Sequence, residues 1–209
     1  SPTIAETREV RITDGNACGA YFGRVIRGID PKAATPGWMA RRLERAGLLT
    51  KSPLVDITNF VMLERGQPMH AFDHAKLEGA IDVRMARPGE ELKLLNEQWA
   101  EYLPNLLLIP DASGPVALGG VMGGFDSMVT DTTTEVFFEA AYFAPEAIQG
   151  RAKALQLASD AAYRFERGVD FGGTLAALER ATQLTLEICG GKAGPVTQAI
   201  GELPARAPV

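Results

Sequence analysis

The segment Glu135–Phe143, EVFFEAAYF, is an apolar run with one acid, Glu139, inside it. Its aromatic and aliphatic residues predict a β-strand, and alternation along a strand places Phe137 and Glu139 on one face and Phe138 and Ala140 on the other. Because burying an ionised carboxylate without partners is very costly, something must hydrogen-bond to Glu139. The acid is either structural, accepting backbone N–H bonds or pairing with an arginine, or it belongs to a binding site.

Helices and strands elsewhere in the chain do not alternate regularly. Further strands are predicted where β-like runs end at turn residues, at 21–30, 81–86, 90–95 and 105–110. Helices are predicted from the N-cap Thr35 to Gly47, from about Asp56 to Arg65, from Pro145 to about Leu157, and from Leu175, the start of a buried stripe, to Cys189. We therefore expect an α+β fold with layered β-sheets in a β-sandwich-like core and flanking helices.

The composition excludes several classes of protein. Cys18 and Cys189 form no CxxC pair, so neither a zinc site nor a disulfide framework is indicated, and two cysteines suit a reducing cytoplasm. No apolar run approaches the roughly 20 residues that span a bilayer. The net charge of −5 opposes general attraction of nucleic acid, so any RNA contact must be local.

A glycine-rich stretch, LGGVMGGFDS at 118–127, precedes the strand that carries Glu139. Glycine lets a backbone approach a ligand closely. The stretch fits neither GxGxxG nor GxxxxGK[ST], so a phosphate cradle is not indicated. A tight turn, close strand packing and a ligand-facing loop all remain open.

The stretch HAFDH at 70–74 holds both histidines of the chain, His70 and His74, together with Asp73. With Glu139 these residues could supply the three convergent ligands that a metal site needs. The stretch follows Pro68 in what is predicted to be a loop, so helical convergence of the ligands cannot be assumed. A metal-dependent hydrolase is therefore a minority hypothesis.

Four motifs in order carry a resemblance to a known family. They are VDITNFVMLERGQPMHAFD (55–73), GGVMGG (119–124), FFEAAYFAP (137–145) and SDAAYRFERGVD (159–170). Together they resemble the paired third and fourth domains of the β subunit of bacterial phenylalanine–tRNA synthetase, the editing module of that enzyme. The resemblance implies an N-terminal connecting segment at 1–17, the module at 18–194 and a C-terminal linker at 195–209. The start at Ser1 and the tail GELPARAPV also predict a segment of a longer polypeptide.

The resemblance implies hydrolysis of tyrosine that is wrongly esterified to tRNA-Phe, whereas phenylalanine is spared. A pocket that hydrogen-bonds a hydroxyl can reject the analogue that lacks it by roughly 10⁴ or more. Water would attack the ester, and no protein nucleophile is assigned. ATP and magnesium are expected only in the full synthetase, so this segment should need no cofactor.

The resemblance also assigns residues. Glu139 matches the family's tyrosine-selecting glutamate, with the ring against apolar neighbours such as Phe137. Gly123 matches a glycine whose N–H can meet the phenol oxygen, and His70 matches a pocket histidine near the ester end. Ala161 matches the pocket wall, and Ser159 stands where a threonine is common. Two departures from the family pattern, Phe60 and LLTKSP (48–53), are expected to lie away from the pocket.

The implied partners are tRNA-Phe carrying a mischarged tyrosine, the α subunit and the remainder of the β subunit, in an assembly of two α and two β chains, without a membrane and in the cytoplasm. A rival hypothesis is a non-catalytic scaffold that holds RNA or the partner subunit. In that case Glu139 would pair with an arginine such as Arg164 and have no cavity beside it.

Overall fold

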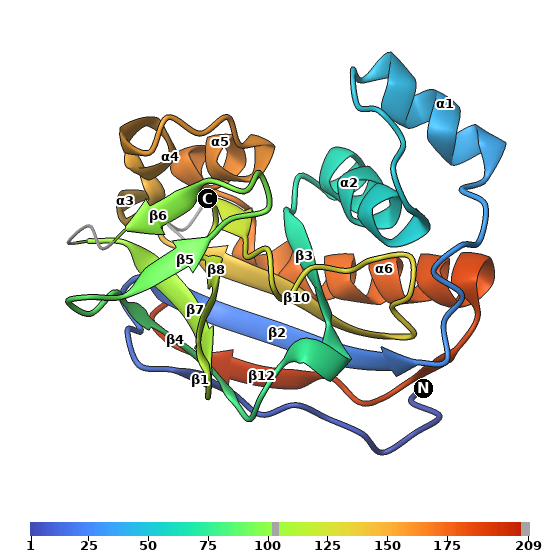
Figure 1. Ribbon diagram of the computed structural model, residues 1–209, viewed down its shortest axis with the longest axis horizontal. Coiled ribbons are helices and arrows are strands. Elements are labelled where there is room, and N and C mark those ends of the chain that lie inside the picture. The colour runs from blue at the N-terminus through green and yellow to red at the C-terminus, as the bar shows by residue number, and fades with distance from the viewer. Residues whose placement is uncertain (102–104, 206–209) are drawn as a thin grey trace.

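A computed structural model describes residues 1–101 and 105–205 of the chain. Strands from distant parts of the sequence form two main sheets and a small one (Figure 1). The first sheet has the order β1 (Val10–Ile12), β4 (Ile81–Met85), β7 (Leu107–Asp111), β8 (Gly114–Leu118) and β9 (Met122–Gly123). The second has the order β11 (Lys192–Ala193), β2 (Cys18–Arg27), β10 (Glu135–Phe143) and β3 (Met69–Asp73), and β12 (Thr197–Ile200) also pairs with β2. β5 (Glu91–Lys93) pairs with β6 (Trp99–Glu101).

Strand β10 is the central strand of the second sheet, and its two faces enter different cores. Phe137 packs in the core between the two sheets, whereas Phe138 and Ala140 pack in the core beneath the helices. The predicted strand and its alternation are therefore confirmed. The layers follow from this division, because a strand that is apolar on both faces must be covered on both.

The helices cover the second sheet and one end of the first (Figure 1). Those that share the core with the outer face of the second sheet are α1 (Gly37–Arg45), α2 (Pro53–Arg65) and α6 (Thr174–Cys189). Shorter helices gather near β5 and β6, namely α3 (Pro145–Ile148), α4 (Arg151–Ala154) and α5 (Asp160–Arg167). Single 3₁₀ turns are η1 (His74–Lys76) and η2 (Phe171–Gly173). The expected layered α+β fold is confirmed, and the described helices are too short or too polar to cross a membrane.

Three of the predicted element ends are wrong for local reasons. The strand expected to end at Asp30 stops at Arg27, because Gly28 adopts a left-handed φ of 73°. Thr35 does not cap α1. Its hydroxyl donates instead to buried Asp56 at 2.6 Å, and Pro36 takes the cap position. α2 begins at Pro53, one turn before the expected Asp56, with proline in the first turn as its missing N–H permits.

Two helices near the end of the chain also differ from expectation. The single helix expected from Pro145 to Leu157 is two short helices, because Gly150 takes a left-handed φ of 76° between them. α6 begins at Thr174, one residue before the expected start, and ends at Cys189 as predicted. The stripe predicted to begin at Leu175 is buried at Leu178, Thr182, Thr185 and Cys189, but Leu175 itself is 41% exposed.

The ends of the chain contribute strands to both sheets. β1 lies within 1–17 and runs parallel to β4, with Val10 opposite Ile81. β12 lies within 195–209 and pairs with β2, with Thr197 opposite Gly23. Both segments that were expected to be connections, 1–17 and 195–209, thus contain a strand that pairs with a strand of the module. Residues 206–209 lie outside the described part of the chain, and the domain boundaries stay a prediction.

Candidate binding cleft with a buried acid

Two adjoining cavities lie between strand β3, the glycine-rich stretch and α5. The outer cavity has a volume of about 430 Å³, and the inner recess has a volume of about 60 Å³. Both are lined by His70, Val121, Gly123 and Ala161, so the two cavities share a wall. Glu139 lines the recess but not the outer cavity. The glycine-rich stretch is therefore a cavity wall, and it also packs closely, because side chains at Gly123 and Gly124 would overlap His70 and the carbonyl of Val116.

Strand register brings the two predicted polar residues together. His70 of β3 lies directly opposite Glu139 of β10, so the two side chains share the face that looks toward the first sheet. On the other side of β10, Glu139 lies opposite Gly23 of β2. Two residues that are 69 positions apart in the sequence thus form one cross-strand pair.

Glu139 has a partner that the sequence analysis did not identify. The phenol of Tyr21 donates to Oε2 of Glu139 at 2.7 Å, and both side chains are buried. Arg164 instead donates to the carbonyl of Asp160, so the arginine partner named by the rival scaffold hypothesis is wrong. Burial raises the pKa of Glu139 to about 7, and the hydrogen bond from Tyr21 partly opposes this rise.

His70 presents a neutral imidazole to both cavities. Burial lowers its pKa to about 4, because the cationic form would lose hydration. Its Nε2 atom is shielded from solvent and has no hydrogen-bond partner among the described residues. The ring packs edge-on against Phe72 at 4.3 Å between centroids. A buried polar atom without a partner is uncommon and is consistent with a place for a ligand or water.

Gly123 makes room for His70. A side chain added at Gly123 would overlap the imidazole ring of His70. The same relation holds deeper in the sheet, where a side chain at Gly23 would overlap the ring of Phe137. Phe137 lies on the same strand face as Glu139, but it lines neither cavity. It packs in the core between the two sheets instead.

Ser159 has a structural role at the cavity wall. Its hydroxyl accepts the N–H of Ala162 at 3.0 Å as the N-cap of α5, and it donates to the carbonyl of Val121 at 2.6 Å. The hydroxyl thus ties α5 to the glycine-rich stretch. Ala161 then follows in the first turn of α5 and lines both cavities. Helix α5 was not predicted, although Ser159 is a normal N-cap residue.

Replacing Ser159 by alanine should lower the free energy of unfolding by about 1–2 kcal/mol, because a helix cap and a second hydrogen bond are both lost. Ser159→Thr keeps the hydroxyl and is the matched control, with a stability close to that of the wild type. Denaturant unfolding of the three proteins measures the difference. Equal stability of the alanine and threonine variants would contradict the assigned role.

Several residues of the outer cavity were missed from the sequence. Lys51 of LLTKSP lines it, so the expectation that this stretch lies away from the pocket is wrong, whereas Phe60 does lie away. Thr58 and Asn59 of α2 also line it. Thr58 and Asn59 lie among apolar residues of α2, and the sequence pattern does not show which other element a helix position will face. These cavity residues could therefore not be found from the sequence pattern alone.

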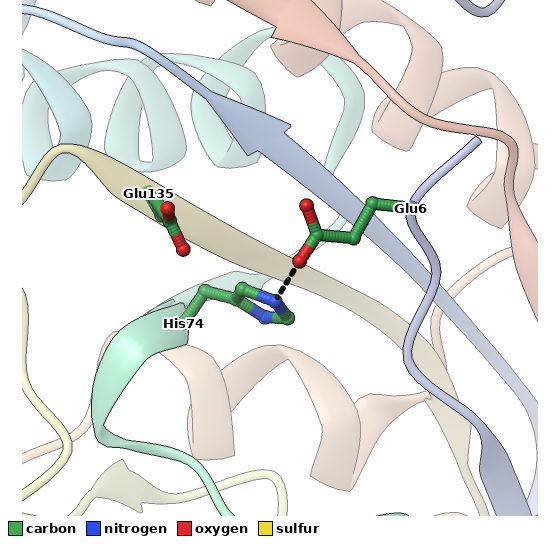
Figure 2. Close-up of side chains that lie close together, drawn as sticks. All are labelled: Glu6, His74 and Glu135. Carbon is green, nitrogen blue, oxygen red and sulfur yellow. Dashed lines mark hydrogen bonds and ion pairs between the residues drawn. The ribbon is translucent and has the colours of Figure 1, made fainter. Parts of the chain in front are cut away.

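The metal hypothesis built on HAFDH is wrong in its ligand set. His70 faces the cavities, whereas Asp73 accepts the hydroxyl of Thr133 and the N–H of Ala75. Among the described residues, the possible ligand atoms that lie within 4.8 Å of one another belong to Glu6, His74 and Glu135 (Figure 2).

This second cluster is an ion-pair network. Figure 2 shows Nε2 of His74 directed at Oε1 of Glu6, at 3.1 Å. Arg8 donates to Nδ1 of His74, so the neutral ring carries its hydrogen on Nε2 and offers no free lone pair there. Arg27 pairs with both Glu6 and Glu135. The network fastens the N-terminal segment to β10, and its atoms are already occupied.

Comparison with known proteins places this chain in a family. A family model described as "B3/4 domain" matches residues 17–190. The phenylalanine–tRNA ligase β subunit of Thiobacillus denitrificans is 56% identical over 209 residues, which are 100% of this chain and 27% of that protein. The β subunit of Chromobacterium violaceum is 54% identical over 206 residues, 99% of this chain and 26% of that protein. The chain therefore spans about a quarter of the length of these relatives.

A solved structure supports the fold. An N-terminal fragment of the phenylalanyl-tRNA synthetase β-subunit from Pyrococcus horikoshii superposes with a TM-score of 0.55 at 12% sequence identity, over 93% of this chain and 53% of that one. At this identity the likeness concerns the arrangement of helices and strands alone.

Proposed function

The chain belongs to the B3/4 domain family, and from this premise we propose that it is the editing module of a phenylalanine–tRNA ligase β subunit. In this role it hydrolyses the ester of tyrosine that has been mischarged onto tRNA-Phe. The matches to β subunits along the whole chain support its place in the ligase. The partners proposed with it are tRNA-Phe, the α subunit and the rest of the β subunit, in the cytoplasm.

One observation carries the proposal: a carboxylate, Glu139, lies buried at the end of a recess and faces no cation among the described residues. Such a group accepts a hydroxyl from a bound tyrosine ring. With phenylalanine bound in the same place, the accepting oxygen would be dehydrated without a partner, at a cost of about 1–3 kcal/mol or more. The site thus distinguishes the two amino acids by making the binding of phenylalanine, the correct one, less favourable.

The chemistry at the other end of the ligand is assigned to water. Burial raises the pKa of Cys18, which removes thiolate character, and the hydroxyl of Ser159 is held by its own hydrogen bonds. His70 is neutral near pH 7, so it can accept a hydrogen bond from an attacking water and orient it, but it does not supply an imidazolium acid. ATP and magnesium are left to the rest of the ligase, and no cofactor is assigned to this segment.

The scaffold hypothesis is less well supported. It requires Glu139 in a closed ion pair with no space beside it. The acid instead accepts a phenol and borders a recess that adjoins the outer cavity. These two features favour a binding site over a core-forming role.

The direct test is the rate at which tyrosine and phenylalanine are released from tRNA-Phe by the ligase that carries this segment. We expect tyrosine to be released faster, with a ratio approaching roughly 10⁴ if the buried hydroxyl partner is fully used. Ala161→Leu should suppress the release of tyrosine, because it adds bulk at a position that lines both cavities. Equal rates for the two esters would refute the proposal.

A further inference from the structure

Tyr21 is the residue that holds Glu139, and it does so from the neighbouring strand. In the β2–β10 register Tyr21 lies opposite Ala141, two positions from Glu139. Diagonal neighbours of this kind are within reach of an aromatic side chain on the same sheet face. The phenol is completely buried and ends 2.7 Å from Oε2 of Glu139.

The two oxygens of Glu139 have different surroundings. Oε2 accepts from Tyr21, whereas no described residue donates a hydrogen bond to Oε1. Although Oε1 has no donor, it is not fully shielded from solvent. The side chain of Glu139 lines the inner recess. Since a carboxylate can accept several hydrogen bonds, a second donor can bind at Oε1 while Tyr21 stays in place.

We propose that Tyr21 is a specificity-determining positioning residue: its phenol fixes one oxygen of Glu139 and leaves the other as the acceptor for the hydroxyl of the substrate. This inference rests on the proposed editing function. The internal phenol is thus a permanent partner of the acid rather than an occupant that the substrate must displace. A displaced Tyr21 would leave its own buried hydroxyl without a partner, which is unfavourable.

Tyr21 also makes Glu139 easier to ionise, although burial has the larger effect and leaves its pKa raised. The titratable groups that face the acid are Tyr21 and Cys18 from β2 and His70 from β3, and the recess wall adds Gly123 and Ala161, which do not titrate. None of these groups is a cation near pH 7. The hydrogen bond from Tyr21 is therefore the interaction that opposes the rise in the pKa of Glu139 caused by burial. Tyr21 itself stays protonated, because burial and the nearby acid raise its pKa well above 10.

The test is Tyr21→Phe in the complete ligase, with kcat/KM measured for tyrosyl-tRNA-Phe and phenylalanyl-tRNA-Phe between pH 6 and 9. In the wild type the preference for tyrosine should rise with pH as Glu139 ionises. Without the phenol the carboxyl ionises only at higher pH, so this rise should move to more alkaline pH. Near pH 7 the preference should fall by about tenfold, the difference between hydrogen bonds to charged and neutral acceptors.

Two controls separate this role from simple packing. Tyr142→Phe changes a buried tyrosine on the other face of the same sheet and should leave the pH profile unchanged. In a Glu139→Gln background, where the acceptor no longer titrates, Tyr21→Phe should move no pH profile. Thermal unfolding of each variant checks that the fold is retained.

The outcomes distinguish this inference from the function on which it rests. If Tyr21→Phe raises the rate with the tyrosyl ester, the phenol competes with the substrate and the inference is wrong. It is equally wrong if the preference and its pH profile stay unchanged while Glu139→Gln abolishes the preference. If Glu139→Gln also leaves the preference intact, Glu139 is not the selecting acid and the inference loses its premise, whereas equal wild-type rates for the two esters would refute the proposed function itself.

Discussion

Glu139→Gln should lower kcat/KM for tyrosyl-tRNA-Phe about 10- to 100-fold, because the hydrogen bond from the substrate hydroxyl then goes to a neutral amide instead of a charged oxygen. The rate with phenylalanyl-tRNA-Phe should stay the same or rise, since a neutral side chain is less costly to leave without a partner. The preference for tyrosine should therefore be lost, because the rate with the tyrosyl ester falls and the rate with the phenylalanyl ester does not. Deacylation kinetics in the complete ligase give both rates.

Glu135→Gln is the matched control, because it makes the same chemical change on the same face of β10, four residues away. Glu135 lies at the end of the strand in ion pairs with Arg27 and has no contact with either cavity. This variant should keep the preference for tyrosine. A similar loss of preference in both variants would mean that the charge of the strand, rather than the position of Glu139, matters.

The parts of the fold that were predictable are those that local chemistry decides. The alternation in EVFFEAAYF gives both the strand and its two faces, and α2 ends at Arg65 as expected, before Gly66 in a left-handed conformation. The helix expected from Pro145 to Leu157 breaks at Gly150, where a glycine permits two conformations and tertiary packing chooses between them. β8 and β9 were not predicted, because glycines and a proline interrupt the apolar residues of GPVALGGVMG (114–123), and both have low strand propensity.

The site was less predictable than the fold, because its residues meet through strand pairing. A carboxylate inside an apolar run indicates that Glu139 needs a partner. The partner, Tyr21, is 118 positions away, and only the β2–β10 register makes the two neighbours. The choice of His70, Gly123 and Ala161 came from family resemblance. The structure places all three around the same recess, which no spacing in the sequence specifies.

The pH dependence of stability should separate the two titrating groups of the site. Burial raises the pKa of Glu139 to about 7 from 4.5, so the native state binds more protons than the unfolded state between these values and stability falls as pH rises. Burial lowers the pKa of His70 to about 4 from 6.5, so there the unfolded state binds more protons and stability rises with pH. Each effect reaches up to about 3 kcal/mol across its window, and the two oppose each other between pH 4.5 and 6.5.

Removing one group should therefore expose the other. In Glu139→Gln the free energy of unfolding should rise, relative to the wild type, by up to about 3 kcal/mol between pH 4.5 and 6.5. In His70→Gln it should fall by a similar amount over the same range. Urea unfolding at several pH values measures both slopes, and subtracting the wild-type profile removes the groups that all three proteins share. Parallel profiles would show that neither the acid nor the imidazole is dehydrated in the native state. Because the cost on phenylalanine depends on that dehydration, the same result would also remove the physical basis of the proposed discrimination.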